Sequence, residues 1–384
     1  MNMSVKFPER SKSSYLSPEQ IEAFGQEIET IRREVMDHLG EADALYIYKI
    51  RNFVRYSEIA SRGMLMFGGW IPPVWLFGTG LLGVSKIVEN MELGHNVMHG
   101  QFDWLNDPSL NGANYDWDTI ATGDDWKHTH NYVHHTYTNI VGKDHDVGYG
   151  LLRVSEQQKW EPRFLLNIPM AAQLMLFFEW YVGVQNLHLE DTLVYKTRSW
   201  KQVWLDSAKL RKKVVRQVGK DYVFFPLIAG PNAIPVFMGN AVANVIRNLW
   251  SSAVIFNGHF TEDAETFEED HTATETRAQW YLRQIRGSSN FSGAEWLHIL
   301  SGNLSHQIEH HLFPDMPANR YAEVAPKVKA LCEAYGVHYN EANFTQQFWS
   351  VWVRLAKCSL PNDVSTKLTG RWQKIKQRLL GGYT

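Results

Sequence analysis

Three histidine clusters, far apart in the chain, are the residues best suited to chemistry. The first contains His95 and His99, the second His130, His134 and His135, and the third His306, His310 and His311. Each cluster includes two histidines four residues apart, a spacing that places both on one face of a helix. Neutral imidazole is the commonest metal-binding side chain. Three such clusters therefore indicate one metal site that holds more than one ion.

The ligand types favour iron over zinc. A closed zinc site needs four ligands, usually with thiolates, but Cys332 and Cys358 are the only cysteines and form no CxxC pair. Eight imidazoles are too many for one zinc ion and suit two irons, whose open positions leave room for dioxygen. Acids near the clusters are candidates to orient the imidazoles by hydrogen bonds. They are Glu92, Asp124, Asp144, Asp146 and Glu309.

Helices must position these clusters, and some helix boundaries are visible. The Ser-Pro-Glu-Gln run at 17–20 is typical of a helix start with a capping box. We expect this helix to run to Leu39 and to be closed by Gly40. A second helix from about Ala42 mixes aromatic and basic residues, which suits lipid headgroups or an ordinary protein surface equally well. Another helix is expected at 318–335.

Apolar residues gather in three segments, 63–85, 164–189 and 222–258, whereas the mean hydropathy of the chain is −0.32. Segment 63–85 exceeds the ~20 residues of a membrane crossing, and Pro72 and Pro73 should kink or turn it. Segment 222–258 is too long for one crossing. Either the last two segments each cross once, or the first lies flat and the second is a hairpin. The basic run at 209–220 favours the hairpin, because positive charge prefers the cytoplasmic side.

The net charge, the N-terminal residues and the distribution of apolar segments limit the kinds of partner and indicate a domain organisation. A net charge of −3 argues against nucleic acid, and the first 14 residues lack the apolar core of a cleaved signal. We expect interfacial helices over 1–60 and the membrane helices and histidine clusters over 61–320. A C-terminal helical cap should follow over 321–384, with a basic amphipathic tail at 367–380.

The clusters read HNVMH, HNYVHHTYTN and HQIEHHLFP. They resemble the three histidine boxes of the membrane fatty acid desaturase family, over roughly residues 60–320, with most likeness to bacterial acyl-CoA desaturases of the linoleoyl-CoA desaturase branch. The resemblance implies an all-α fold, an integral membrane helical bundle whose cytoplasmic helical cap holds two non-haem irons. It also implies a ninth ligand at the end of the last membrane helix, a place that His259 fits, with Asn257 nearby to hold a water.

Two features depart from the family pattern. Many relatives have a glutamine three residues before the His-His pair, and here both His306 and Gln307 are present, which leaves open which of them faces iron. His128 and His145 are extra and are expected near the centre or at the surface. The chain also lacks the family's haem-binding His-Pro-Gly-Gly and its cysteine-rich ferredoxin segment. Electrons are therefore expected from a separate ferredoxin or NAD(P)H-dependent reductase.

The resemblance implies an oxygen-dependent desaturase of the bacterial cytoplasmic membrane, with the histidine boxes on the cytoplasmic side. It would insert a cis double bond into an acyl-CoA or acyl-lipid, and position 9 of a saturated C16–C18 acyl-CoA is our expectation. Basic residues at 51–62 or 209–220 are candidates to hold a CoA phosphate. A hydroxylase or alkane-oxidising enzyme with the same irons is the alternative. A metal storage or transport protein is disfavoured, because transport ligands should lie within the membrane spans.

Overall fold

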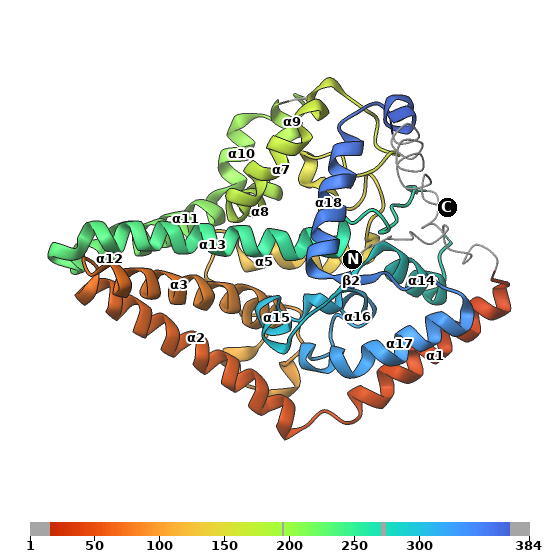
Figure 1. Cartoon of the computed structure of the whole chain (residues 1–384), viewed down its shortest axis with the longest axis horizontal. Coiled ribbons are helices and arrows are strands. Elements are labelled where there is room, and N and C mark those ends of the chain that lie inside the picture. Colours follow the sequence, from red (N-terminus) through yellow and green to blue (C-terminus); the bar gives the residue numbers. More distant parts are fainter. Residues whose placement is uncertain (1–15, 194–195, 270–273, 369–384) are drawn as a thin grey trace, which may run out of the picture.

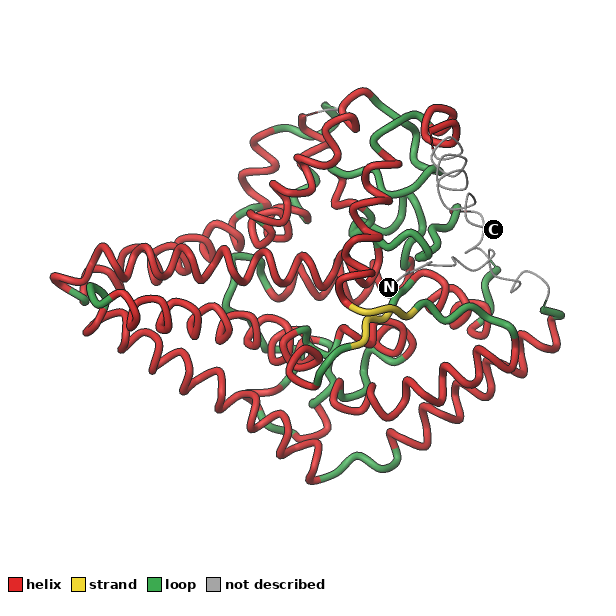
Figure 2. Tube along the Cα trace, in the orientation of Figure 1, coloured by secondary structure: helices red, strands yellow, loops and turns green. Residues whose placement is uncertain are grey.

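The structure is a computed structural model that describes residues 16–193, 196–269 and 274–368. In these ranges the chain is mostly helical, as predicted, with a single two-stranded parallel sheet (Figures 1 and 2). Strand β1 (Asn290–Ser292) pairs with β2 (Glu341–Asn343). The basic tail beyond residue 368 and the first 15 residues, on which the signal prediction was based, lie outside the described residues.

The first helices follow the predicted boundaries with one correction. Helix α1 (Pro18–Met36) begins at the predicted capping box, in which Ser17 and Gln20 bond reciprocally. It ends at Met36, so the prediction that Gly40 closes this helix is wrong. Gly40 instead precedes α2 (Glu41–Gly68), where Asp43 bonds back to its backbone N–H.

Two helical hairpins form one end of the molecule. In the first, α2 turns at 69–71 into α3 (Pro72–Val88), which confirms the turn predicted at the two prolines. In the second, α11 (Ala208–Val218) continues through a π-helical stretch and α12 (Phe225–Ile228), and then turns at Gly230–Asn232 into α13 (Ala233–His259). Segment 222–258 therefore turns back on itself, as in the hairpin alternative, and which segments cross a membrane stays a prediction.

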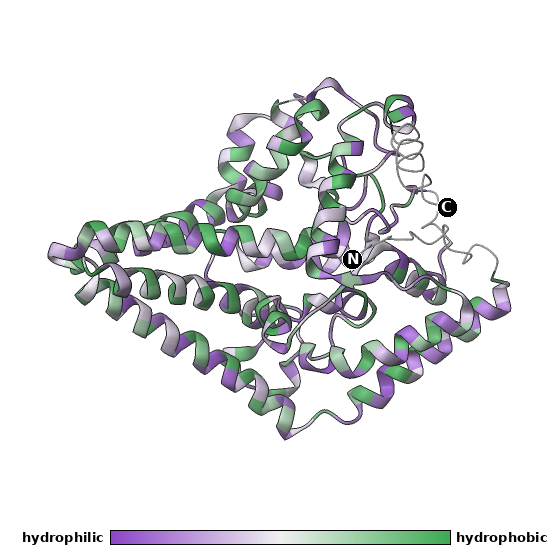
Figure 3. Cartoon of the chain, in the orientation of Figure 1, coloured by the Kyte–Doolittle hydropathy of each residue, from purple (hydrophilic) through white to green (hydrophobic). Residues whose placement is uncertain are grey.

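The turns of the two hairpins lie together at one tip (Figure 1). The indole N–H of Trp70 donates to the Pro231 carbonyl, and that of Trp75 to the Pro235 carbonyl, both at 2.9 Å. Many large apolar side chains on these helices are exposed, among them Phe67 at 86% and Leu227 at 73%. Figure 3 shows the hydrophobic residues along α3, α12 and α13.

No single helix in the described ranges has both the length and the apolar composition of a membrane span. The residues Pro162–Leu176 and Phe178–Gln185 meet both criteria only as a pair, and a 92° bend separates them. The uncharged segment 63–85 is divided between α2 and α3. Helix α13 is long enough, but it carries Asn240, Asn244 and Arg247, all of them buried inside the bundle.

A helical cap forms another part. Helices α1, α14 (Arg277–Gly287), α16 (Gln307–Leu312) and α17 (Tyr321–Tyr335) share the largest apolar core. The helix predicted at 318–335 is confirmed as a 3₁₀ turn followed by α17. The other helices are α4 (Asn96–Met98), α5 (Gly123–Trp126), α6 (His135–Tyr137), α7 (Asn167–Leu176), α8 (Phe178–Gln185), α9 (Leu189–Leu193), α10 (Trp200–Asp206), α15 (Glu295–Leu300) and α18 (Phe344–Cys358).

Candidate metal centre

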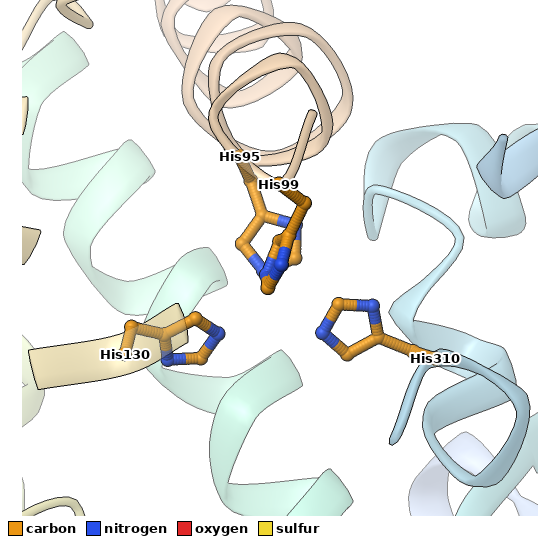
Figure 4. Close-up of side chains that lie close together, drawn as sticks. All are labelled: His95, His99, His130 and His310. Atoms are coloured by element: carbon orange, nitrogen blue, oxygen red, sulfur yellow. The ribbon is translucent and has the colours of Figure 1, made fainter. Parts of the chain in front are cut away.

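The three histidine clusters meet where the hairpins join the cap. A ligand nitrogen from each of four rings lies within 4.8 Å of the other three (Figure 4). We call this the first group, and it consists of His95, His99, His130 and His310. A second group obeys the same limit and consists of His134, His259 and His311. Two adjacent nitrogen-rich groups are the arrangement expected for a two-metal centre.

His135 lies between the two groups. Its ring centroid is 4.8 Å from those of His99 and His310 in the first group. It is 4.5 Å from that of His311 in the second group. The His135 ring therefore packs against ligands of both groups.

π-helical turns carry the first two clusters. His95 ends the π-helix Glu89–His95, and His130 and His134 lie in the π-helix Lys127–His134. Such turns hold more residues than α-helical turns and are frequent at functional sites. They change the direction in which successive side chains point, so the four-residue spacing alone did not determine the geometry of these rings.

Hydrogen bonds at the outer nitrogens orient the rings. The Nδ1 atom of His134 lies 2.9 Å from an oxygen of Asp144, that of His311 lies 3.0 Å from Gln284 Oε1, and that of His310 lies 3.3 Å from the Tyr321 hydroxyl. Partners of this kind fix the tautomer and orientation of metal-binding imidazoles.

The inner nitrogens fit a metal. Seven buried histidine Nε2 atoms have no hydrogen-bond partner among the described residues. Four of them belong to His95, His99, His130 and His310, the whole first group, and the others belong to His135, His306 and His338. Unpaired buried polar atoms are costly, and a bound cation would satisfy all four at once.

Burial and the neighbouring imidazoles favour the neutral form of most of these rings. Burial is the larger cause and repulsion between the rings is the second, and together they lower the pKa of His99, His135 and His310 well below its usual value. Metal binding requires the neutral imidazole. These three rings are therefore in the metal-binding form at neutral pH, whereas the charges of Asp144 and Asp146 raise the pKa of His134.

The structure distinguishes Gln307 from His306. The Gln307 side-chain nitrogen lies 3.0 Å from His259 Nε2. His306 belongs to neither group, and its ring stacks on His298 with the centroids 4.9 Å apart. The physical reason is that α16 begins at Gln307, so His306 precedes the helix that carries His310 and does not share its face.

Asn257, predicted to hold a water, is buried at the end of α13 beside His259. Its side-chain amide donates to the Phe344 carbonyl at 3.4 Å. Its Oδ1 has no partner within the described ranges, so this oxygen is free to accept from a water.

The two extra histidines lie at the surface. His128 is exposed and stacks on Tyr132, away from both groups. His145 is also exposed, and its ring centroid lies 5.1 Å from that of His188. Neither residue belongs to the two histidine groups.

An enclosed pocket adjoins both groups. His130, His134 and His259 line one side of it, and Met91, Phe178, Ile255 and Leu304 are among its apolar walls. The pocket also contacts an ion pair between Arg247 and Glu179, at 2.6 Å. Arg247 precedes His259 by twelve residues on α13, or about 18 Å at ~1.5 Å per residue. The pocket thus extends from the histidines along α13 to a buried ion pair.

Comparison with known proteins agrees with this geometry. The family model described as fatty acid desaturase matches residues 69–343. The chain belongs to the fatty acid desaturase family. This desaturase is 44% identical over 356 residues to a protein of Mycobacterium tuberculosis named NADPH-dependent stearoyl-CoA 9-desaturase, and the match covers 91% of this chain and 82% of the relative.

More distant relatives are also desaturases. An sn-1 linoleoyl-lipid 6-desaturase of Synechocystis is 28% identical over 283 residues, which cover 72% of this chain and 77% of the relative. A Delta(5) fatty acid desaturase A of Dictyostelium discoideum is 26% identical over 292 residues, covering 68% and 58%. The desaturase is thus an oxidoreductase, and these names favour neither the hydroxylase nor the storage alternative.

Only two of the five acids suggested by the sequence orient the rings of the desaturase. Asp144 holds His134, and Asp146 lies 3.3 Å from His130 Nδ1 and 3.7 Å from His134 Nδ1. Because these two rings belong to different groups, Asp146 links both. The other three acids bond elsewhere: Asp124 to Lys209, Glu92 to Tyr46 and Asn303, and Glu309 to Asn290 and Tyr339.

Sequence reasoning missed several residues that orient these rings. Gln284 and Tyr321 bond His311 and His310, and Gln185 holds Asp146 at 2.6 Å. Each is a single polar residue outside the boxes, and although Tyr321 lies only 11 residues after His310, no local pattern signals any of the three. Thr138 lies 3.3 Å from His311 Nδ1. It falls within residues 136–139 of the second histidine box, so the resemblance to the family did give a local signal for it.

Proposed function

We propose that this desaturase inserts a cis double bond between carbons 9 and 10 of a saturated C16–C18 acyl-CoA, using dioxygen and two irons. The observation that carries the proposal is the pair of histidine groups beside an enclosed, largely apolar pocket. The name of the mycobacterial relative supports the acyl-CoA and the position of the bond.

We assign one iron to each histidine group, with His135 and Gln307 beside them. Iron bound there supplies an oxidant, formed from dioxygen, that can break unactivated methylene C–H bonds. One hydrogen leaves each of two adjacent carbons and a C=C bond forms. These two hydrogens, with two added electrons and two protons, convert the dioxygen into two waters.

The protein positions the chain and excludes water. The apolar walls of the pocket hold the methylenes beside His130, His134 and His259, and a dry site prevents side reactions of the oxidant. A hydrocarbon cannot solvate a charged pair. The chain is therefore expected to stop at Arg247 and Glu179, which would limit its length.

Several basic residues considered for the CoA phosphate are engaged elsewhere. Arg62 pairs with Asp221, and Lys213 and Lys220 pair with Asp116 and Asp118. Lys212 and Arg216 are exposed on α11, so this helix remains our candidate for the phosphate contact.

The exposed apolar residues of the two hairpins support placement of those hairpins in a bilayer, with the metal centre on the cytoplasmic side. Two electrons per turnover would come from a separate NADPH-dependent donor, consistent with the relative's name. The three divisions 1–60, 61–320 and 321–384 stay a prediction, and α2 runs across the boundary at residue 60.

Fatty acid analysis tests the proposal. The chain is expressed in a host that makes only saturated acids, with iron and a reductase supplied, and the double bonds are located by mass spectrometry. We expect C16 and C18 acids unsaturated at position 9, about two irons per chain, and no alkene from His310→Ala. An alcohol as product, or a double bond at another position, would overturn the assignment.

A further inference from the structure

Helix α8 forms one wall of the enclosed pocket and lies against α13 (Figure 1). The pocket touches Phe178, Glu179, Val182 and Gln185 of this helix. Residues 178, 182 and 185 are spaced by four and three positions, so they share one helix face. Glu179, near the start of α8, pairs with Arg247. An acyl chain in the pocket would therefore contact α8 from this ion pair to Gln185.

Gln185 holds a carboxylate that lies beside both histidine groups. Its side-chain N–H donates to Asp146 Oδ1 at 2.6 Å. The other oxygen, Asp146 Oδ2, lies 3.3 Å from His130 Nδ1 in the first group and 3.7 Å from His134 Nδ1 in the second. The wall of the pocket is thus connected, through one amide and one carboxylate, to a ring of each proposed iron.

Asp146 differs in two ways from three other groups that orient the rings. Asp144, Gln284 and Tyr321 do not line the enclosed pocket, whereas Asp146 does. Asp144 lies 2.9 Å from His134 Nδ1, but the 3.7 Å from Asp146 to the same nitrogen is too long for a hydrogen bond. Hydrogen bonds at an active site commonly tighten when the substrate binds. Asp146 is therefore the ring partner best placed to respond to a chain in the pocket.

We propose that Gln185 is a positioning residue through which an acyl chain in the pocket tightens Asp146 against His130 and His134. The inference rests on the proposed function, because it takes the chain to occupy this pocket. Gln185 is half-buried and the Asp146 side chain is 14% exposed, so a hydrocarbon packed on α8 would expel water from both. Hydrogen bonds strengthen where water is excluded. Chain binding and iron binding therefore strengthen each other, by the same factor in both directions.

Ferrous-ion affinity tests the inference, measured without dioxygen by competition with a chelator, in the presence and absence of stearoyl-CoA. Stearoyl-CoA should raise the ferrous affinity of the wild type about fivefold or more, within the usual range of coupling between two sites. Gln185→Leu removes the amide donor, so stearoyl-CoA should leave the ferrous affinity of this variant nearly unchanged. The ligand-field circular dichroism of the ferrous ions should change on addition of stearoyl-CoA in the wild type but not in Gln185→Leu.

Gln173→Leu is the matched control and should behave as wild type, because Gln173 is exposed on α7 and does not line the pocket. Asp146→Asn should also lose the coupling, and the double variant with Gln185→Leu should lose no more, since both changes act on one contact.

Wild-type coupling in Gln185→Leu would overturn the inference. So would a loss of stearoyl-CoA binding by metal-free Gln185→Leu, because Gln185 would then act on substrate binding alone. The assay contains no dioxygen, so a wild type that shows the coupling but forms no position-9 alkene in air would contradict the proposed function alone.

Discussion

The imidazoles of the metal centre depend on partners that never touch a metal. Asp144 accepts from His134 and from the backbone N–H groups of Asn139 and Asp146. Its carboxylate is thereby fixed before any ion binds. Burial lowers the pKa of His134, but the charges of Asp144 and Asp146 outweigh it and raise that pKa.

Asp144→Asn should lower iron affinity about 10–100-fold, the usual effect of removing such a partner. The new amide would present N–H donors where His134 and Asn139 already donate. Iron per chain after dialysis against a chelator measures the effect. Asp124→Asn is the control, because Asp124 is exposed and pairs with Lys209. Equal retention of iron by Asp144→Asn and wild type would contradict the prediction.

The third box provides a second prediction. His306→Phe preserves a ring that can stack on His298 and should leave iron content and activity as in wild type. Gln307→Ala removes the amide beside His259 and should reduce activity about tenfold or more, in line with losses at other residues beside metal ligands. Product formation and iron content of both purified variants give the answer. A larger loss of iron or activity in His306→Phe than in Gln307→Ala would instead place His306 at the metal.

At the scale of elements, one carboxylate joins the start of α2 to the start of α17. Asp43 is buried and accepts from Gly40 N–H, from the Asn319 amide at 2.7 Å and from Arg320 at 2.6 and 2.8 Å. Burial alone would raise the pKa of Asp43, but the hydrogen bonds from Arg320 and Asn319 outweigh it and hold the pKa below the usual value.

Asp43→Asn should lower the free energy of unfolding by roughly 1.5–3 kcal/mol at neutral pH, the range for hydrogen bonds to charged groups. Because the folded pKa is depressed, the carboxylate contributes fully above the unfolded pKa of about 3.9. That contribution is lost as the pH falls through the lower folded pKa. Thermal unfolding in detergent from pH 7 to pH 3 should therefore show the two proteins converging in acid. Asp363→Asn, at an exposed site, should match wild type throughout.

Local signals predicted α1, the proline turn before α3 and the helix at 318–335, because caps and prolines act within a few residues. The box histidines were predicted for a different reason, since a metal accounts best for one ligand type that recurs in three distant places. The start of α16 at Gln307 had no such signal, and that start excludes His306 from the cluster. Tertiary partners such as Gln284 depend on packing between helices, which the order of residues along one helix does not reveal.

At the scale of the whole molecule, many of the exposed large apolar residues gather at one end, although others, such as Trp200 and Trp349, lie elsewhere. The exposed apolar residues of α2, α3, α12 and α13 surround one tip, and the cap lies at the other end (Figures 1 and 3). This polarity is the arrangement expected if the tip enters lipid and the cap faces an aqueous donor. Whether each end lies in lipid or in water can therefore be tested.

Cysteine labelling can test this orientation. Cys332 and Cys358 are both buried, and burial raises the pKa of each thiol, so the native background should be unreactive. In inverted membrane vesicles, Lys327→Cys on α17 should react with a membrane-impermeant maleimide, and Phe77→Cys on α3 should react only after detergent is added. In sealed spheroplasts neither should react. Labelling of Lys327→Cys from the outside would invert the proposed topology.

The row of polar residues within α13 has a consequence for biogenesis. Asn240 and Asn244 bond to Asp221 and Tyr222 of the preceding helical stretch, and Arg247 pairs with Glu179. An amide or guanidinium without such a partner would cost several kcal/mol in hydrocarbon. Helix α13 is thus poorly suited to partition into lipid alone as it leaves the ribosome. With the hairpins in a bilayer, as proposed above, insertion of α13 would have to await its partners, and the segment would enter late and as part of a preassembled unit.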